Sequence, residues 1–219
     1  MSKLAVKTKK TAAPAEPAGG AKKLEILEGA RRVFRAEGFD GASMDKIAQA
    51  AGVSKGTLYV YFRNKEELFK ALVTVDRQEA AEQLCRFDGD DGPVAEALQR
   101  AGESFIAMMI RPEHIALIRM VMGAAEKFPE AGQLFYDMGP RCGIGRLADY
   151  LRRQVAAGSL AIADDDVELA AAHFLNLCQG NLVKPLLFSV GEAPGCQEIQ
   201  KTVASGVRVF LRAYGSPAS

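Results

Sequence analysis

The sequence contains no tryptophan, two histidines and four cysteines among its 219 residues. The cysteines, Cys85, Cys142, Cys178 and Cys196, are widely separated, and none forms a C-x-x-C pair. With so few histidines and no paired cysteines, the sequence predicts neither a zinc site nor another metal cofactor. No secretory signal is recognisable, so we expect reduced thiols and a cytoplasmic location.

Long apolar runs are missing too. The sequence has no run of about 18 apolar residues, which predicts no transmembrane helix and no membrane partner. The net charge of +1 neither favours nor excludes nucleic acid. Its distribution is more informative: residues 1–75 carry 14 Lys and Arg against 8 Asp and Glu, and residues 76–219 carry 14 against 19. This asymmetry predicts that only the first part of the chain meets DNA.

Catalytic groups at a workable spacing are not found, so we predict that the chain is not an enzyme and needs no cofactor. The nearest nucleophile and base, Cys178 and His173, lie about 140° apart around one predicted helix. Residues 164–166 are three consecutive aspartates, which capping of a helix start explains more simply than metal binding. Residues 87–93, FDGDDGP, resemble a calcium loop, but Gln99 stands where a bidentate Glu would close it. We interpret this segment as a turn.

The most informative stretch is residues 39–69, FDGASMDKIAQAAGVSKGTLYVYFRNKEELF. Ser43 is a good N-cap for a short helix that Gly52 would end in a left-handed conformation. Ser54 would cap a second helix that runs to about Phe62. Four residues recur at three- and four-residue steps in the first helix and form one apolar stripe: Met44, Ile47, Ala48 and Ala51. The pattern predicts a helix-turn-helix.

The second helix would bury Leu58 and leave small and polar residues outside. A glycine within a helix costs about 1 kcal/mol relative to alanine, so Gly56 indicates close approach to another molecule. Lys55 and Lys65 suit a row of phosphates. The other residues on the outer side and flanks are Thr57, Tyr59, Val60 and Tyr61. A plain helical hairpin with a solvated polar face would leave the same pattern.

The segment SMDKIAQAAGVSKGTLYVYFRNKEELF closely resembles the DNA-binding domain of the TetR family of bacterial transcriptional regulators. The resemblance covers about residues 22–72, and Tyr61 departs from it because family members often carry His there. It implies an all-α homodimer that binds a palindromic operator and is usually a repressor released by a small ligand. It also implies that these residues meet DNA: Ser43, Lys55, Gly56, Thr57, Tyr59, Tyr61 and Lys65.

The rest of the chain is predicted to be helical. We expect a disordered basic tail over residues 1–21, the helix-turn-helix domain over 22–72, and a helical regulatory and dimerisation domain over 73–215. Lysines in the tail either strengthen DNA binding as a basic arm or are simply solvated. Further helices are expected over residues 22–37, 65–85, 93–109, 114–127, 129–157 with a kink at Gly139 and Pro140, 164–188 with a bend at Pro185, and 197–214.

Apolar and adaptable side chains between residues 105 and 188 predict a pocket for a mostly apolar effector, although ordinary helical core would explain them equally well. The candidate ligand-binding residues are Phe105, Met109, His114, Met122, His173, Phe174 and Gln179. The last two long helices would pack against a second copy of the chain. Ala170, Ala171, Val203 and Gly206 would permit the close approach, unless these faces pack only within the monomer.

The sequence therefore favours a ligand-responsive transcriptional repressor that binds double-stranded DNA as a homodimer. An activator, or a regulator without a ligand, would have the same architecture and is not distinguished by the sequence. A remote alternative is an enzyme with an appended DNA-binding module.

Overall fold

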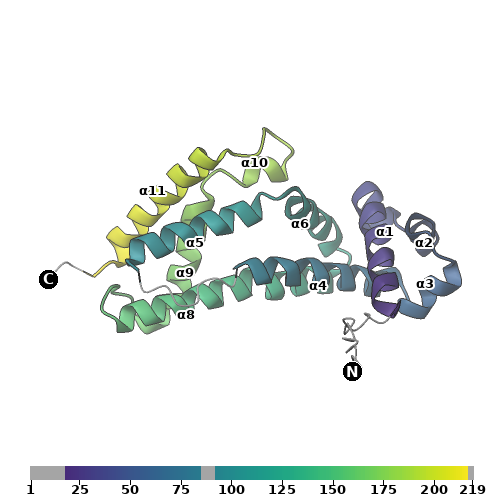
Figure 1. Cartoon of the computed structure of the whole chain (residues 1–219), viewed down its shortest axis with the longest axis horizontal. Coiled ribbons are helices and arrows are strands. Elements are labelled where there is room, and N and C mark those ends of the chain that lie inside the picture. The colour runs from purple at the N-terminus through teal and green to yellow at the C-terminus, as the bar shows by residue number, and fades with distance from the viewer. Residues whose placement is uncertain (1–17, 85–91, 217–219) are drawn as a thin grey trace, which may run out of the picture.

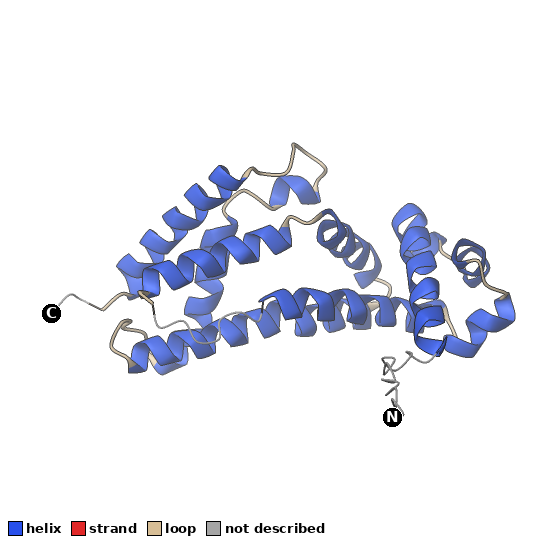
Figure 2. Ribbon diagram, in the orientation of Figure 1, coloured by secondary structure: helices blue, strands red, loops and turns tan. Residues whose placement is uncertain are grey.

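The computed structural model describes residues 18–84 and 92–216, and their regular structure is helical apart from one isolated β-bridge between Leu160 and Gly215. Figure 2 shows this helical content. The prediction of an all-α protein is confirmed. Most of the predicted basic tail, with the lysines of its proposed DNA-binding arm, lies outside the described residues. So does most of the turn predicted at residues 87–93.

The first four helices are α1 (Ala18–Gly41), α2 (Met44–Ala51), α3 (Lys55–Tyr61) and α4 (Lys65–Leu84). The backbone of α1 breaks at Gly38, whose φ of 71° favours glycine. Helices α2 and α3 form the predicted helix-turn-helix, and α4 leads away from it (Figure 1).

Capping residues fix the ends of these short helices. The hydroxyl of Ser43 accepts a hydrogen bond from the backbone N–H of Lys46, and Gly52 ends α2 at a φ of 67°. Ser54 caps α3 by accepting from the N–H of Thr57 at 3.0 Å. The side chain of Asn64 caps α4 in the same way by accepting from Glu67. The sequence predicted all four of these positions, because local hydrogen bonding determines them.

The remaining helices form the larger part of the molecule. They are α5 (Val94–Met109), α6 (Pro112–Ala125), α7 (Pro129–Tyr136), the π-helical turn η1 (Asp137–Arg141), α8 (Cys142–Ala156), the 3-10 turn η2 (Asp164–Asp166), α9 (Val167–Gln179), the short α10 (Lys184–Leu187) and α11 (Cys196–Tyr214). The kink predicted at Gly139 and Pro140 takes the form of η1, a wider turn that accommodates the proline without a regular helical hydrogen bond.

The prediction of one helix over residues 164–188 is wrong. Helix α9 ends at Gln179 because Gly180 adopts a φ of 47° and a ψ of −122°, which lie outside the helical region. Pro185 does not bend the end of that helix, because it lies in the first turn of the separate helix α10, where the missing N–H costs nothing.

Two buried clusters organise the fold. The first joins the apolar faces of α1 to α4 to four residues of α6, namely Leu117, Met120, Val121 and Ala124, and to Phe128 and Ala131 at the start of α7. The second joins α5, α8, α9 and α11. These four helices lie at the end of the molecule far from α2 and α3, as Figure 1 shows.

The four small residues predicted to permit close approach of a second copy lie inside the monomer. Ala170, Ala171 and Val203 are fully buried, and an added Cβ at Gly206 would lie 3.2 Å from the backbone of Leu177 in α9. Gly206 thus allows α11 to approach α9 within one chain, and the other three are buried in the second cluster, so the prediction that these residues face a partner is wrong.

Candidate functional site

Helix α3 presents its outer side to solvent because Leu58, which is fully buried, attaches it to the core. Tyr59 is 45% exposed and Val60 is 82% exposed. An apolar side chain this exposed on a seven-residue helix is available for contact with a base methyl group. The candidate DNA-contact residues selected from the sequence did not include Val60, although the helical period had placed it on the outer side.

Lys55, at the start of α3, pairs with Asp45 of α2 at 2.6 Å. The pairing raises the pKa of Lys55 above its usual value, through the hydrogen bond and the charge of Asp45. Next to it, the hydroxyl groups of Ser54 and Thr57 lie 2.8 Å apart. No side chain crowds Gly56, since an added Cβ would have only the Ser54 hydroxyl within 4 Å. Ser43, whose hydroxyl caps α2, is also exposed.

Two of the predicted DNA-contact residues are turned toward the protein. The ammonium group of Lys65 donates to the carbonyl oxygen of Phe39 at 2.9 Å and lies 4.6 Å from the centre of the Phe39 ring. Tyr61 is half-buried and packs against the first cluster. The ammonium group of Lys65 is thus bound to the backbone at the end of α1.

A cavity of about 290 Å³ lies between α4, α5, α6, α7, α8 and α9. Its wall is mainly apolar, with arginine, histidine, asparagine and glutamine side chains among the residues that line it. These are Arg77, Phe105, Met108, Met109, His114, Ile118, Phe135, Gly139, Pro140, Gly143, Ile144, Arg146, Leu147, Ala172, Leu175, Asn176 and Gln179. A mainly apolar space with a few polar groups is the usual form of a small-molecule site.

Four of the predicted ligand-binding residues are in this wall: Phe105, Met109, His114 and Gln179. The other three are outside it. Met122 is 67% exposed, one turn beyond Ile118 in α6, and Phe174 packs against Phe210 in the second cluster. His173 is exposed, and its Nδ1 atom lies 2.8 Å from the hydroxyl oxygen of Tyr214.

The sequence reasoning missed Arg77. Its side chain is 4% exposed, and its guanidinium lies 4.8 Å from the centre of the Phe135 ring. Burial lowers the pKa of Arg77, although a guanidinium remains charged at neutral pH. Burial, followed by the charges of Arg77 and Arg111, lowers the pKa of His114 to about 4. The spacing of apolar residues in α4 gives no signal for Arg77, because only tertiary packing brings it to the cavity.

Other chemistry has little support within the described residues. There, no three His, Cys, Asp or Glu side chains meet in a group that could hold a metal ion. Burial raises the pKa of the Cys178 thiol to about 12, so this sulfur is a poor nucleophile. In the same part of the chain, none of the helices has the length and apolar character to span a membrane.

Comparison with known proteins identifies both halves of the chain. Residues 26–72 match the family model of bacterial regulatory proteins of the tetR family, and residues 96–216 match that of the AefR-like transcriptional repressor, C-terminal domain. The HTH-type transcriptional regulator YhgD of Bacillus subtilis is 32% identical over 154 residues, which are 69% of this chain and 78% of YhgD.

Two further relatives agree. The transcriptional repressor AcnR of Corynebacterium efficiens is 45% identical over 58 residues, which span 26% of this chain and only 31% of AcnR. The solved structure of the Flavonoid-responsive Regulator FrrA superposes with a TM-score of 0.79 and 32% identity, and covers 91% of this chain and 100% of FrrA. TetR-family regulators are not enzymes, in agreement with the sequence. The chain therefore belongs to the TetR family of bacterial transcriptional regulators, as a DNA-binding repressor with an AefR-like C-terminal domain.

Proposed function

We propose that this repressor acts in the cytoplasm as a homodimer that binds a palindromic operator and is released by a small, mostly apolar ligand. In this proposal residues 22–72 bind DNA, and residues 73–215 bind the ligand and form the dimer. The observation that carries it is that α4 and α6 each contribute both to the wall of the cavity and to the core that supports the helix-turn-helix.

Helix α4 makes this connection along its own length. Leu68 and Phe69, in its first turn, are fully buried in the first cluster, while Arg77 lines the cavity two turns further on. In α6, His114 lines the cavity at one end and Val121 packs in the first cluster. Packed helices move as rigid units, so a ligand that displaces either helix would also displace α3.

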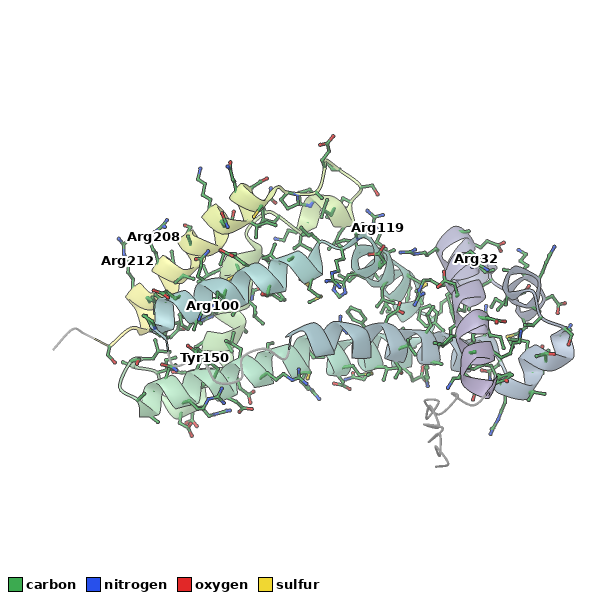
Figure 3. All side chains as sticks on the ribbon, viewed as in Figure 1. Arg32, Arg100, Arg119, Tyr150, Arg208 and Arg212 are labelled. Carbon is green, nitrogen blue, oxygen red and sulfur yellow. The ribbon has the colours of Figure 1, made fainter. Side chains whose placement is uncertain are left out.

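Side-chain contacts reinforce the same connection. Lys127, between α6 and α7, forms an ion pair with Asp40 at the end of α1. The ring of Phe128 stacks on that of Phe39, with their centres 5.3 Å apart. Arg119 of α6 donates to the carbonyl oxygen of Leu187 at the end of α10 (Figure 3), so movement of α6 would also reach α10.

The ligand would contribute free energy only through its preference between two conformations of the dimer. One conformation would place the two α3 helices about 34–36 Å apart, the spacing of successive major grooves, and the other would not. FrrA is named for its response to flavonoids, which are ring compounds with a large apolar surface. This supports a mostly apolar ring compound as the effector class here.

The outer sides of α9 and α11 are the best candidates for the dimer interface. Leu169 of α9 is 54% exposed and Val209 of α11 is 48% exposed. Helices α9 and α11 lie far from the helix-turn-helix, at the end that Figure 1 shows opposite α2 and α3. A pairing of these two helices with their symmetry mates would be isologous, which matches the two-fold symmetry of a palindromic site.

The test is fluorescence anisotropy of the full-length protein on labelled DNA from upstream of its own gene, with unrelated DNA as the control. The titrations are repeated over a series of salt concentrations, and the stoichiometry is read at saturation. We expect one palindromic segment to bind much more tightly than the control, with two chains per site. Equal binding to all DNA would contradict a specific operator in this segment, and no binding even at low salt would contradict the proposed DNA-binding surface.

A further inference from the structure

Arg77 is a buried cation in the wall of the cavity. Its side chain is 4% exposed, and it reaches the cavity from α4. Its Nε atom is buried and meets no hydrogen-bond acceptor within the part of the chain that the structure describes. A buried guanidinium is normally paired, because removal of its charge from water is costly.

Among the described residues, no acidic side chain pairs with the guanidinium of Arg77. None of those that line the cavity is Asp or Glu. The adjacent Asp76 forms an ion pair with Arg31 of α1. Among the described residues, Cys142 favours the charged form of Arg77, but its effect is smaller than that of burial. The positive charge therefore faces the cavity without a carboxylate beside it in this part of the chain.

Two contacts hold the guanidinium in place without neutralising it. The Phe135 ring lies 4.8 Å from Cζ, and Gly139 lets the backbone of η1 approach so closely that an added Cβ would lie 2.1 Å from Nη2. His114, whose pKa is lowered to about 4, is neutral beside it at pH 7. The surroundings thus fix the position of a cation and leave it ready for an anion.

We propose that the cavity binds an organic oxyanion, a carboxylate or an ionised phenol on an apolar ring body, and that Arg77 is its counter-ion. This inference rests on the proposed function, since it assigns a chemical class to the effector. The apolar body would pack on Met108, Ile118 and Leu175, which also line the wall. A cavity of about 290 Å³ suits a compound of two or three fused rings.

Isothermal titration calorimetry of the full-length protein tests the proposal with two matched pairs of compounds. Naphthoate is compared with naphthamide, and a nitronaphthol that is ionised at neutral pH is compared with its methyl ether. For wild type we expect the anion of at least one pair to bind roughly tenfold or more tightly than its neutral partner, the ratio typical of a charge-assisted hydrogen bond. The pair that shows this ratio identifies the acidic group.

Arg77→Met should remove the ratio and leave binding of the neutral compounds unchanged. Arg111→Met is the matched control, because Arg111 is an exposed cation near His114 that is not among the residues lining the cavity. The control should keep the ratio. Equal binding of anion and neutral partner by wild type, retention of the ratio by Arg77→Met, or no binding by any of the four compounds would each overturn the proposal.

Gly139→Ala is a second variant that keeps the charge but pushes the guanidinium from its place. It should lose the ratio even if Arg77→Met does not fold, and an unchanged ratio would overturn the proposal. Operator binding is measured separately in the ligand-free protein. If wild type binds its operator but shows no preference for anions, the inference fails alone; if it binds no DNA, the proposed function fails while the calorimetry can still be read.

Discussion

Lys65 at the start of α4 and Phe39 at the end of α1 are joined by a hydrogen bond of 2.9 Å from the ammonium group to the carbonyl oxygen. The same ammonium lies above the Phe39 ring at 4.6 Å from its centre. The contact satisfies a carbonyl group that the break of α1 at Gly38 leaves near the end of the helix. Lys65 is therefore better placed to stabilise the helix-turn-helix than to contact phosphate.

Lys65→Ala should lower the free energy of unfolding by about 2 kcal/mol, the usual contribution of a hydrogen bond with one charged partner. Thermal and urea unfolding measure this change. The salt dependence of operator binding should stay the same in Lys65→Ala. In Lys55→Ala, the slope of log binding constant against log salt concentration should fall by about one, the value for one lost phosphate contact. A flatter slope for Lys65→Ala would instead assign its ammonium to the DNA.

Val60→Ala should change which bases are preferred and leave the salt dependence intact. Val60 is 82% exposed on the outer side of α3, so its methyl groups can reach the methyl group of a thymine. Binding to a library of operators with one base pair changed at a time measures this effect. We expect a loss of about 1 kcal/mol of discrimination at one position in each half-site; a uniform loss across the library would argue against a base contact.

His114 should make stability depend on pH between about 6.5 and about 4. Burial and two arginines lower the folded-state pKa to about 4 from a usual value of 6.5, so the unfolded chain takes up the proton first. The stability conferred by the neutral ring is complete above pH 6.5 and decreases as the pH falls, by up to about 3 kcal/mol. Urea unfolding of wild type and His114→Gln at each pH should show this loss in wild type alone, and parallel curves would contradict it.

Gly102→Ala and Gly145→Ala should have opposite effects on stability. A Cβ at Gly102 in α5 would lie 2.6 Å from Cγ1 of Val203 and 2.8 Å from Sγ of Cys178, so overpacking should cost about 1–3 kcal/mol. At Gly145 in α8 nothing lies within 4 Å, and the better helix propensity of alanine should add up to about 1 kcal/mol. The melting temperature of each variant is compared with that of wild type. A shift in the same direction for both would contradict this packing.

Leu169→Asp should convert the proposed dimer to a monomer. The control is Leu24→Asp in α1, because Leu24 is 55% exposed and Leu169 is 54% exposed, so the two changes are matched in chemistry and exposure. Light scattering coupled to gel filtration should give the monomer mass for Leu169→Asp and the dimer mass for the control. A dimer in both variants would place the interface elsewhere.

The sequence predicted the helix-turn-helix well because its determinants are local. Ser43, Gly52, Ser54 and Asn64 act on residues no more than four positions away, and the apolar stripe follows the helical period. The position at which a helix ends within a long apolar segment depends less on neighbouring residues. Nothing in the periodicity of residues 164–188 marks Gly180 as the end of α9, since a glycine is tolerated within a helix at modest cost.

The cavity could be predicted only in part, because it depends on how helices distant in sequence meet. Phe105, Met109 and His114 were selected as apolar or polar candidates and lie in the wall, whereas Phe174 has the same apolar character and lies in the core. One sequence does not separate these two environments. Arg77 was missed because a lone arginine in a helix is usually solvated, whereas here tertiary packing, including Phe135 of α7, buries it.

The most direct test of the account is the release of operator by a compound that fills the cavity. A compound first shown by calorimetry to bind wild type, from flavonoids and the matched naphthalene pairs, is titrated into the protein–operator complex, and anisotropy follows the DNA. Ala172→Trp, which places a large ring in the cavity wall, is the control. We predict that the compound dissociates the wild-type complex and leaves the control complex intact. If the compound binds wild type and operator affinity does not change, the cavity does not control DNA binding, and the account is contradicted.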